Sequence, residues 1–180
     1  MPARADILRP SGEALMKLAA ERPWSGIGLR AVAEEAKVPL ADLFARIGSK
    51  RALLAEVSRR LDRDVLAAPA GESDDPHDRL FDAVMARIEA MAPYRPALLA
   101  IISAENPALL APHLPRTARA VLEAAGLDAS PPRLFAMTAV WARVVQVWRD
   151  DEGALNRTMA EIDRRLKQMR RALRFLGAGY

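Results

Sequence analysis

Side chains that could carry out catalysis or hold a metal ion are few and scattered in this sequence. There is no cysteine, and the two histidines, His77 and His113, lie far apart, each next to a proline. Protein zinc sites combine several Cys and His ligands, so no metal centre is expected. The acidic run at residues 150–152 ends a predicted helix and is better explained as a solvated turn than as paired catalytic carboxylates or a Ca²⁺ site. We see no nucleophile elbow, phosphate-binding Gly loop or dinucleotide fingerprint, and we predict neither enzyme activity nor a cofactor.

The more informative charged residues are basic and lie between residues 30 and 50. Arg30, Arg46 and Lys50 accompany two short apolar patterns of helical spacing, at residues 29–36 and 39–47, with a two-residue break between them. Two short helices joined in this way form a helix-turn-helix. In that motif the second helix enters the major groove of DNA, while the first crosses the backbone. The pattern therefore predicts a nucleic-acid-binding unit near the N-terminus.

Helical periodicity dominates the rest of the chain, and no stretch of strict alternation predicts a strand. Ser49 is placed to cap the helix that follows it. The segment 69–78 (PAGESDDPHD) is the clearest linker, so we expect a DNA-binding head over residues 1–64 and an effector-binding and dimerisation domain over residues 65–180. The predicted helices cover residues 10–21, 29–36, 39–47, 49–67, 77–91, 95–104, 115–125, 131–150 and 155–175.

Charge and composition limit the partners. The net charge is +4, and residues 1–64 carry most of the basic excess, which favours a polyanionic partner, either nucleic acid or a membrane surface. No apolar run reaches the ~20 residues that span a bilayer, and the first ten residues have no signal-peptide core. We therefore expect a soluble, cytoplasmic protein.

Four motifs between Ala14 and Val57 follow one another with a familiar spacing. They are ALMKLAAER in the first helix, LRAVAEEAKV in the second, the Leu43-Phe44 pair in the third and GSKRALL at the start of the fourth. Together they resemble the DNA-binding head of TetR-family transcriptional regulators. The resemblance implies an all-α homodimer with an N-terminal three-helix helix-turn-helix head and a helical ligand-binding and dimerisation body. Each head would read half of a DNA operator, and a bound effector would shift the spacing of the heads. The expected DNA-contacting residues are Arg30, Leu40, Ala41, Phe44, Arg46, Ser49 and Lys50.

The same stretch departs from the family pattern at its surface. Lys37 stands where the turn usually has glycine, and Gly28 where a Ser or Thr usually caps the second helix. Pro39–Asp42 replaces Ser-Lys-Gly-Thr, Phe44 replaces Tyr and Arg46 replaces His. Several phosphate donors are lost, and the carboxylate of Asp42 would repel DNA. Arg46 and Arg51 are expected to compensate for these losses; the alternative is a head that keeps the fold but has lost its operator.

Residues 131–150 carry the most distinctive apolar pattern of the predicted body. Leu134, Met137, Trp141, Val144 and Trp148 fall on one helix face, which would serve either the dimer or a pocket. Methionines in the preceding helices suit an adaptable apolar pocket, and the scarcity of polar groups favours a small apolar or lipid-like ligand. The alternative is ordinary core or dimer packing. The predicted ligand-binding residues are Phe81, Met85, Ile88, Met91, Ile101, Phe135, Met137, Trp141, Val145 and Trp148.

A second similarity covers Val147–Leu166. Trp148, the Asp150-Asp151 pair, Thr158-Met159 and residues 163–166 resemble the C-terminal region of TetR-like lipid-binding proteins of ubiquinone biosynthesis. This resemblance implies an alternative function, that of an isoprenoid-binding accessory protein that does not bind DNA. The leading hypothesis is a dimeric repressor that reads DNA with residues 39–47 and responds to a small apolar molecule.

The C-terminal helix adds a further expectation. Six basic residues between positions 164 and 174 are interleaved with apolar ones at helical spacing. A basic amphipathic helix of this kind can lie on an anionic membrane surface. The alternative is a solvated terminal helix that packs its apolar face on the body.

Overall fold

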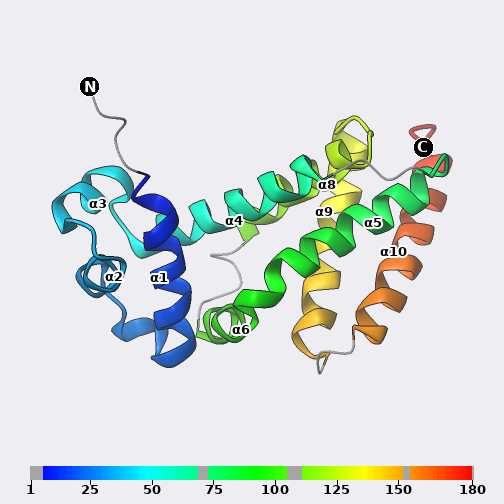
Figure 1. The fold of residues 1–180 in the computed structure, drawn as a ribbon. Coiled ribbons are helices and arrows are strands. Elements are labelled where there is room, and N and C mark those ends of the chain that lie inside the picture. The colour runs from blue at the N-terminus through cyan, green and yellow to red at the C-terminus, as the bar shows by residue number, and fades with distance from the viewer. Residues whose placement is uncertain (1–5, 69–72, 105–110, 152–154, 180) are drawn as a thin grey trace. The chain divides into compact units, whose positions relative to one another are not determined.

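The computed structural model describes residues 6–68, 73–104, 111–151 and 155–179. Every regular element in these ranges is a helix, and they contain no strand, which confirms the predicted all-α class (Figure 1). The α-helices are α1 (Leu8–Glu21), α2 (Leu29–Ala36), α3 (Leu40–Ile47), α4 (Lys50–Ala67), α5 (Pro76–Met91), α6 (Arg95–Ala104), α8 (Leu114–Ala124), α9 (Pro131–Arg149) and α10 (Asn156–Phe175). Short 3₁₀ turns are η1 (Trp24–Gly26), η2 (Ala92–Tyr94) and η3 (Ala111–His113).

The predicted helices lie within two residues of these bounds. The largest difference is at α1, which begins at Leu8 and so contains Pro10. Proline is tolerated there because the first turn of a helix has no intrahelical partner for its backbone N–H groups. Ser49 caps α4 as predicted, since its Oγ accepts a hydrogen bond from the Ala52 N–H at 3.1 Å.

The chain forms two compact units. The first unit contains residues up to 60 together with 93–104, and the second contains residues 61–92 and the described residues from 111 onward. Helix α4 contributes residues to both, and α6 belongs to the first unit although it follows α5 in the chain. The functional division at residue 64 stays a prediction.

The first unit is built around α1, which packs against α2 and α6. Each of these helices turns an apolar face inward, because its apolar residues recur every three or four positions. The side chains that are almost completely buried in this core include Leu15, Leu18, Val32, Leu43, Leu53 and Ile101. The core fixes α2 and α3 through Val32 and Leu43 and leaves their other faces outside.

The turn between α2 and α3 is closed by Lys37, which adopts a left-handed conformation with φ 54° and ψ 41°. The Val38 N–H donates to the Ala33 carbonyl at 3.0 Å and the Lys37 N–H to the Glu34 carbonyl at 3.2 Å. These two bonds form a Schellman motif, which satisfies carbonyls that the end of a helix leaves open. A lysine in this conformation costs about 1–2 kcal/mol relative to the right-handed one. The turn therefore keeps its geometry without the glycine that the TetR-family pattern described above usually has at this position.

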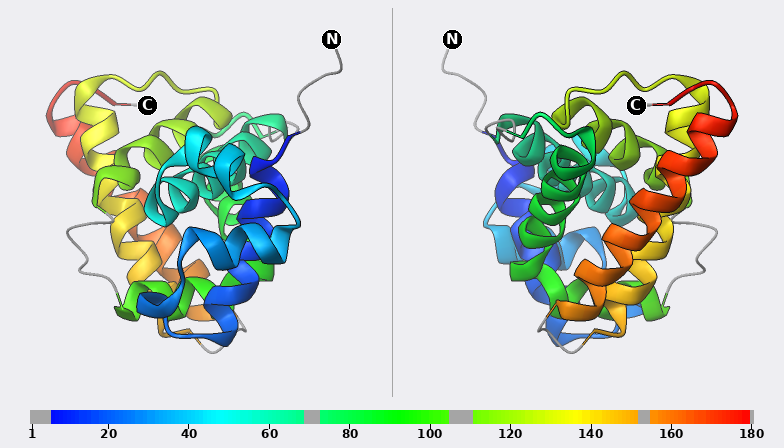
Figure 2. Two further views of the ribbon diagram at one scale, coloured as in Figure 1. Left: turned by 90° about the vertical axis from the view of Figure 1, so that its left-hand side faces the viewer. Right: turned by 90° about the vertical axis from the view of Figure 1, so that its right-hand side faces the viewer.

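The second unit contains residues 61–67 of α4 and a ring of four helices, in which α5 packs on α8, α8 on α9, α9 on α10 and α10 on α5. Helices α9 and α10 run side by side as an antiparallel hairpin (Figures 1 and 2). Arg133 Nη2, near the start of α9, donates to the Gly179 carbonyl beyond the end of α10 at 2.7 Å. The interior of the ring is filled by almost completely buried side chains, which include Leu80, Ile88, Leu122, Met137, Trp148, Ile162 and Leu166.

Close contact between α1 and α4 depends on Gly12. A Cβ atom added to Gly12 would lie 2.8 Å from Val57 Cγ2, and Val57 is buried and stiff because it is β-branched. We expect Gly12→Ala to lower the free energy of unfolding by about 1–3 kcal/mol through overpacking, even though alanine is the better helix former. Urea denaturation of the wild type and the variant measures this change.

The matched control is Val57→Ala, which makes room for the added methyl group. The double variant Gly12→Ala/Val57→Ala should be more stable than the sum of the two single changes predicts, because the clash is gone. Strictly additive changes would show that the two positions are not in contact.

Candidate nucleic-acid interface

Helix α3 presents a broad surface to solvent. Leu43 is buried and Leu40 and Ile47 are half-buried, so these three residues hold the helix in the first unit. The solvent-facing residues are Ala41, Asp42, Phe44, Ala45 and Arg46. Phe44 as a whole residue is 63% exposed, and it is the one large hydrophobic residue that is exposed among the described residues of the first unit. The outer face of α3 is thus mainly apolar, with one carboxylate and one guanidinium.

The N-terminus of α2 lies on the same motif. Gly28 is its N-cap and offers no side-chain oxygen, and a Cβ atom at this position would meet nothing within 4 Å. Arg30 follows in the first turn of α2 and is exposed. Of the seven residues predicted to contact DNA, Arg30, Ala41, Phe44, Arg46 and Ser49 are exposed, while Leu40 and Lys50 are half-buried.

Lys50 has an internal role that the sequence did not reveal. Its Nζ donates to the carbonyl oxygens of Trp24 and Ile27, the latter at 2.9 Å. The ammonium also lies 4.6 Å from the centroid of the Trp24 ring, within the range of a cation–π contact. Lys50 therefore ties the start of α4 to the turn between α1 and α2. Its contact with DNA stays a prediction.

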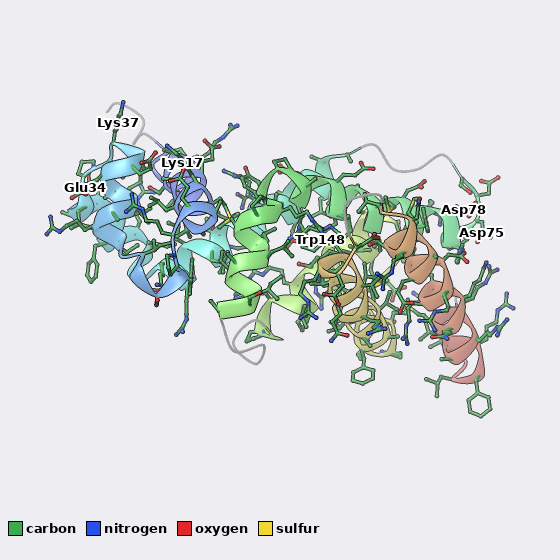
Figure 3. All side chains as sticks on the ribbon, turned by 90° about the horizontal axis from the view of Figure 1, so that it is seen from below. Lys17, Glu34, Lys37, Asp75, Asp78 and Trp148 are labelled. Atoms are coloured by element: carbon green, nitrogen blue, oxygen red, sulfur yellow. The ribbon has the colours of Figure 1, made fainter. Side chains whose placement is uncertain are left out.

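Charges around the motif are partly paired within the first unit. Lys17 Nζ lies 2.6 Å from Glu35 Oε1, and this hydrogen bond lowers the pKa of Glu35 and raises that of Lys17. Arg30, Lys37 and Arg46 have no ion pair or hydrogen bond from their side chains to any residue in the described ranges. Figure 3 shows Lys37 projecting from the end of α2. These three cations are thus available to an anionic partner.

The residues predicted to bind a ligand fall into four groups. Ile88, Met91, Met137, Trp141 and Trp148 are buried in the second unit, where Trp148 lies among the helices (Figure 3). Phe81, Met85 and Val145 are half-buried in the same unit. Ile101 lies in the core of the first unit, and Phe135 does not join the buried set because the residue is 81% exposed. Eight of the ten predicted residues therefore share one unit and are at least half-buried.

A buried polar cluster accompanies these apolar residues. Asp62 Oδ1 accepts hydrogen bonds from Arg87 Nε and from Thr117 Oγ1, both at 2.9 Å. The Arg87 guanidinium lies 5.6 Å from the centroid of the Trp141 ring, and burial lowers the pKa of Arg87. Asp62 Oδ2 is buried and has no hydrogen-bond partner in the described ranges. Sequence reasoning missed this cluster, because its members come from four helices and share no local spacing.

A second charged cluster joins α9 to α10. The carboxylate of Glu161, whose side chain is 8% exposed, accepts hydrogen bonds from Arg143 at 3.1 Å, Arg165 at 2.8 Å and Arg164 at 3.0 Å. Burial by itself would raise the pKa of Glu161, but the three guanidinium groups outweigh burial and hold the pKa at about 2. This carboxylate therefore orients three arginines on the hairpin.

Residues that carried the second sequence similarity make contacts within the chain. Asp151 Oδ2 accepts from both the N–H and the Oγ1 of Thr158 at 2.8 Å and so satisfies the first turn of α10. Asp163 Oδ1 lies 3.0 Å from His77 Nε2 and its Oδ2 lies 2.7 Å from Lys167 Nζ. These contacts within the chain give Asp151, Thr158 and Asp163 structural roles. The link with ubiquinone biosynthesis that the second resemblance implies stays a prediction.

Membrane-spanning and metal-binding features are absent from the described ranges. No helix there combines the length and apolar character that a bilayer crossing requires. No group of three or more His, Cys, Asp or Glu side chains in those ranges is arranged to hold a metal ion.

Comparison with solved structures identifies the fold. The chain is similar to a TetR transcriptional regulator from Rhodococcus sp. RHA1, with a TM-score of 0.68 and 20% identity over 89% of this chain and 93% of that one. It is also similar to the TetR family transcriptional regulator PfmR from Thermus thermophilus, with a TM-score of 0.50 and 21% identity over 91% and 97% of the two chains. No family model and no curated protein matches the sequence. The chain therefore has the fold of TetR-family regulators, and the predicted resemblance is confirmed at the level of the fold.

The contacts of Lys50 predict a cost in stability. Lys50→Met keeps the length of the side chain but leaves the carbonyls of Trp24 and Ile27 without their charged donor, so we expect a loss of about 2 kcal/mol. For a chain of this size, that corresponds to a fall in Tm of roughly 4–8 °C. The control is Lys37→Met, an exposed lysine of the same unit, which should change Tm little. Equal Tm values for both variants would contradict the internal role of Lys50.

The lowered pKa of Glu161 predicts an acid-dependent loss of stability. Because its folded pKa of about 2 lies below the ordinary value of 4.5, the unfolded chain binds more protons between these values, and stability falls as the pH drops through that window. The difference in free energy of unfolding between the wild type and Glu161→Gln should therefore shrink from pH 5 to pH 2, measured by urea denaturation. Glu123→Gln, an exposed position on α8, is the control. A difference that stays constant with pH would rule out this contribution.

Proposed function

We propose that the chain is a DNA-binding transcriptional regulator that acts as a homodimer and responds to a small apolar molecule. The observation that carries this proposal is the outer face of α3 within a helix-turn-helix. Leu43 anchors the helix from behind, the Schellman turn at Lys37 sets its direction, and Phe44 and Arg46 are left exposed. A helix held in this way has the dimensions to enter the major groove.

Cations on neighbouring elements support contact with DNA. Arg46 on α3, Arg30 on α2 and Lys37 in the turn belong to one motif and have no competing ion pair in the described ranges. Arginine can donate two hydrogen bonds to the O6 and N7 of guanine or bind phosphate oxygens. We assign base or phosphate contact to Arg46 first, since it lies on α3 itself.

The hairpin of α9 and α10 is the proposed dimer surface. Phe135 on α9 and Phe175 and Leu176 at the end of α10 are all exposed, and together they would be costly to leave in water. The Arg133–Gly179 hydrogen bond brings the two ends that carry them together. A second copy of the hairpin would cover these residues and form a four-helix bundle.

The second unit is the proposed site for the effector. Its interior is apolar, and the Asp62–Arg87–Thr117 cluster supplies a small number of polar groups beside Trp141, as small-molecule sites commonly do. Repression is the sign of regulation that we propose. The apolar face of α10, with Leu166, Met169 and Leu173, is buried in this unit, as the alternative of a terminal helix packed on the body expects. Membrane contact through this helix and an accessory role in ubiquinone biosynthesis stay predictions.

DNA binding is tested with duplexes selected from a random-sequence library by the full-length protein. We expect the affinity to fall steeply with salt and Arg46→Ala to weaken binding about ten-fold or more, because a well-formed arginine contact is worth ~1–3 kcal/mol. Fluorescence anisotropy over a series of salt concentrations measures both effects. If Arg46 contacts phosphate, the slope of log K against log salt should also decrease by about one.

Arg119→Ala removes an exposed arginine from α8 and serves as the matched control, which should bind like the wild type. Failure to select any duplex, or equal affinities for Arg46→Ala and the wild type, would contradict the proposed DNA-reading role of α3.

A further inference from the structure

The exposed ring of Phe44 is a second feature of α3 that the charges do not explain. Phe44 directly follows the anchoring residue Leu43, about 100° further around the helix axis, and is 63% exposed. A single exposed apolar side chain is common on protein surfaces, but the exposed Ala41 and Ala45 extend Phe44 into a contiguous apolar surface on α3, and contiguous apolar patches mark interaction surfaces. The core of this unit is filled by other large apolar residues, such as Trp24, Leu43 and Ile101. Phe44 is therefore not needed to complete the core, and its position outside calls for another explanation.

The chemistry of a phenyl ring narrows what it can recognise on DNA. The ring has neither a hydrogen-bond donor nor an acceptor, so it cannot bond to phosphate oxygens or to the polar edge of a base. The apolar group that the major groove presents is the C5-methyl group of thymine. The ring of Phe44 can therefore discriminate bases through that methyl group.

The rest of the face supports such a contact. Ala41 and Ala45 are exposed beside Phe44, and their small side chains allow the helix to approach base edges closely. Asp42 and Arg46 carry opposite charges, so electrostatic attraction from α3 alone is weak. A helix with one cation and an apolar outer surface has to obtain much of its selectivity from apolar contact and shape.

We propose that Phe44 reads thymine methyl groups, so that the DNA recognised by this chain carries thymine at defined positions of each half-site. The inference rests on the proposed function, because it requires α3 to enter the major groove. It adds the class of base that the helix selects and names the side chain that makes the selection.

The test removes only the methyl group. Duplexes selected by the full-length protein are rebuilt with each thymine replaced singly by deoxyuridine, and binding is measured by fluorescence anisotropy at one salt concentration. At one or more positions in each half-site the wild type should bind about four-fold more weakly, which corresponds to about 0.8 kcal/mol for one buried methylene-sized group. Phe44→Ala should bind thymine and deoxyuridine duplexes equally at those positions.

Two further variants make the result specific. Phe44→Tyr keeps the ring and should keep the preference for thymine, while Arg46→Ala should weaken binding to both duplexes and leave their ratio unchanged. Because Phe44 is exposed, its replacement should leave Tm close to that of the wild type, so loss of the preference cannot be assigned to unfolding.

The outcomes separate this inference from the proposed function. If the wild type binds selected DNA with steep salt dependence but no deoxyuridine weakens it, or if Phe44→Ala retains the same preference, the thymine inference is overturned while DNA binding stands. If no duplex can be selected, both fail, and the exposed ring is then assigned to a protein partner.

Discussion

The helix-turn-helix depends on one ammonium group that points into the structure it supports. Lys50 bonds to the carbonyls of Trp24 and Ile27 and lies over the Trp24 ring, so it joins the first residue of α4 to the turn that leads into α2. Without the Lys50 ammonium group, the half-buried carbonyl oxygens of Trp24 and Ile27 would lack their charged hydrogen-bond donor. Ser49, the preceding residue, caps the same helix end. Two adjacent polar residues thus fix where α4 begins, directly after the left-handed Gly48 that ends α3.

The scaffold and the surface of the motif obey different constraints. The scaffold needs Val32 and Leu43 inside, a left-handed residue between the helices and a capped start to α4, and each of these is present. The turn requires a left-handed backbone conformation at position 37, but it does not require glycine there. Lys37 adopts that conformation and forms the Schellman hydrogen bonds even though the conformation is unfavourable for a residue with a side chain. The outer face of α3 has no comparable requirement, because its side chains are exposed and do not belong to the buried core. Its chemistry can therefore change without loss of the motif.

The sequence was sufficient to predict the helices, because apolar residues recur with helical spacing and prolines and glycines separate them. It also predicted the cap at Ser49, which depends on a side chain and an N–H three residues apart. It did not reveal the partners of Lys50, since backbone carbonyls leave no trace in the sequence. Asp62, Arg87 and Thr117 were missed for a related reason: Arg87 and Thr117 lie 25 and 55 residues from Asp62, and the three meet only when three helices pack. The place of α6 in the first unit likewise depends on packing against α1 and not on any local pattern.

The surface of α3 departs from the pattern that the family resemblance implies mainly by losing hydrogen-bond donors, although Arg46 in place of histidine adds a cation. Tyrosine gives way to Phe44 and threonine to Asp42, and each change removes a donor that could face phosphate. What is left is a helix with little net charge, two alanines and an exposed ring. Phosphate contacts give affinity without reading sequence, whereas apolar contacts to base edges read sequence with little electrostatic attraction. A head that loses the first kind of contact and keeps the second has to rely on cations elsewhere, such as Arg30 and Lys37, for affinity. Under the proposed function, attraction to the DNA backbone would be divided from selection of bases, the first assigned to α2 with its turn and the second to α3, so that substitutions could separate the two contributions.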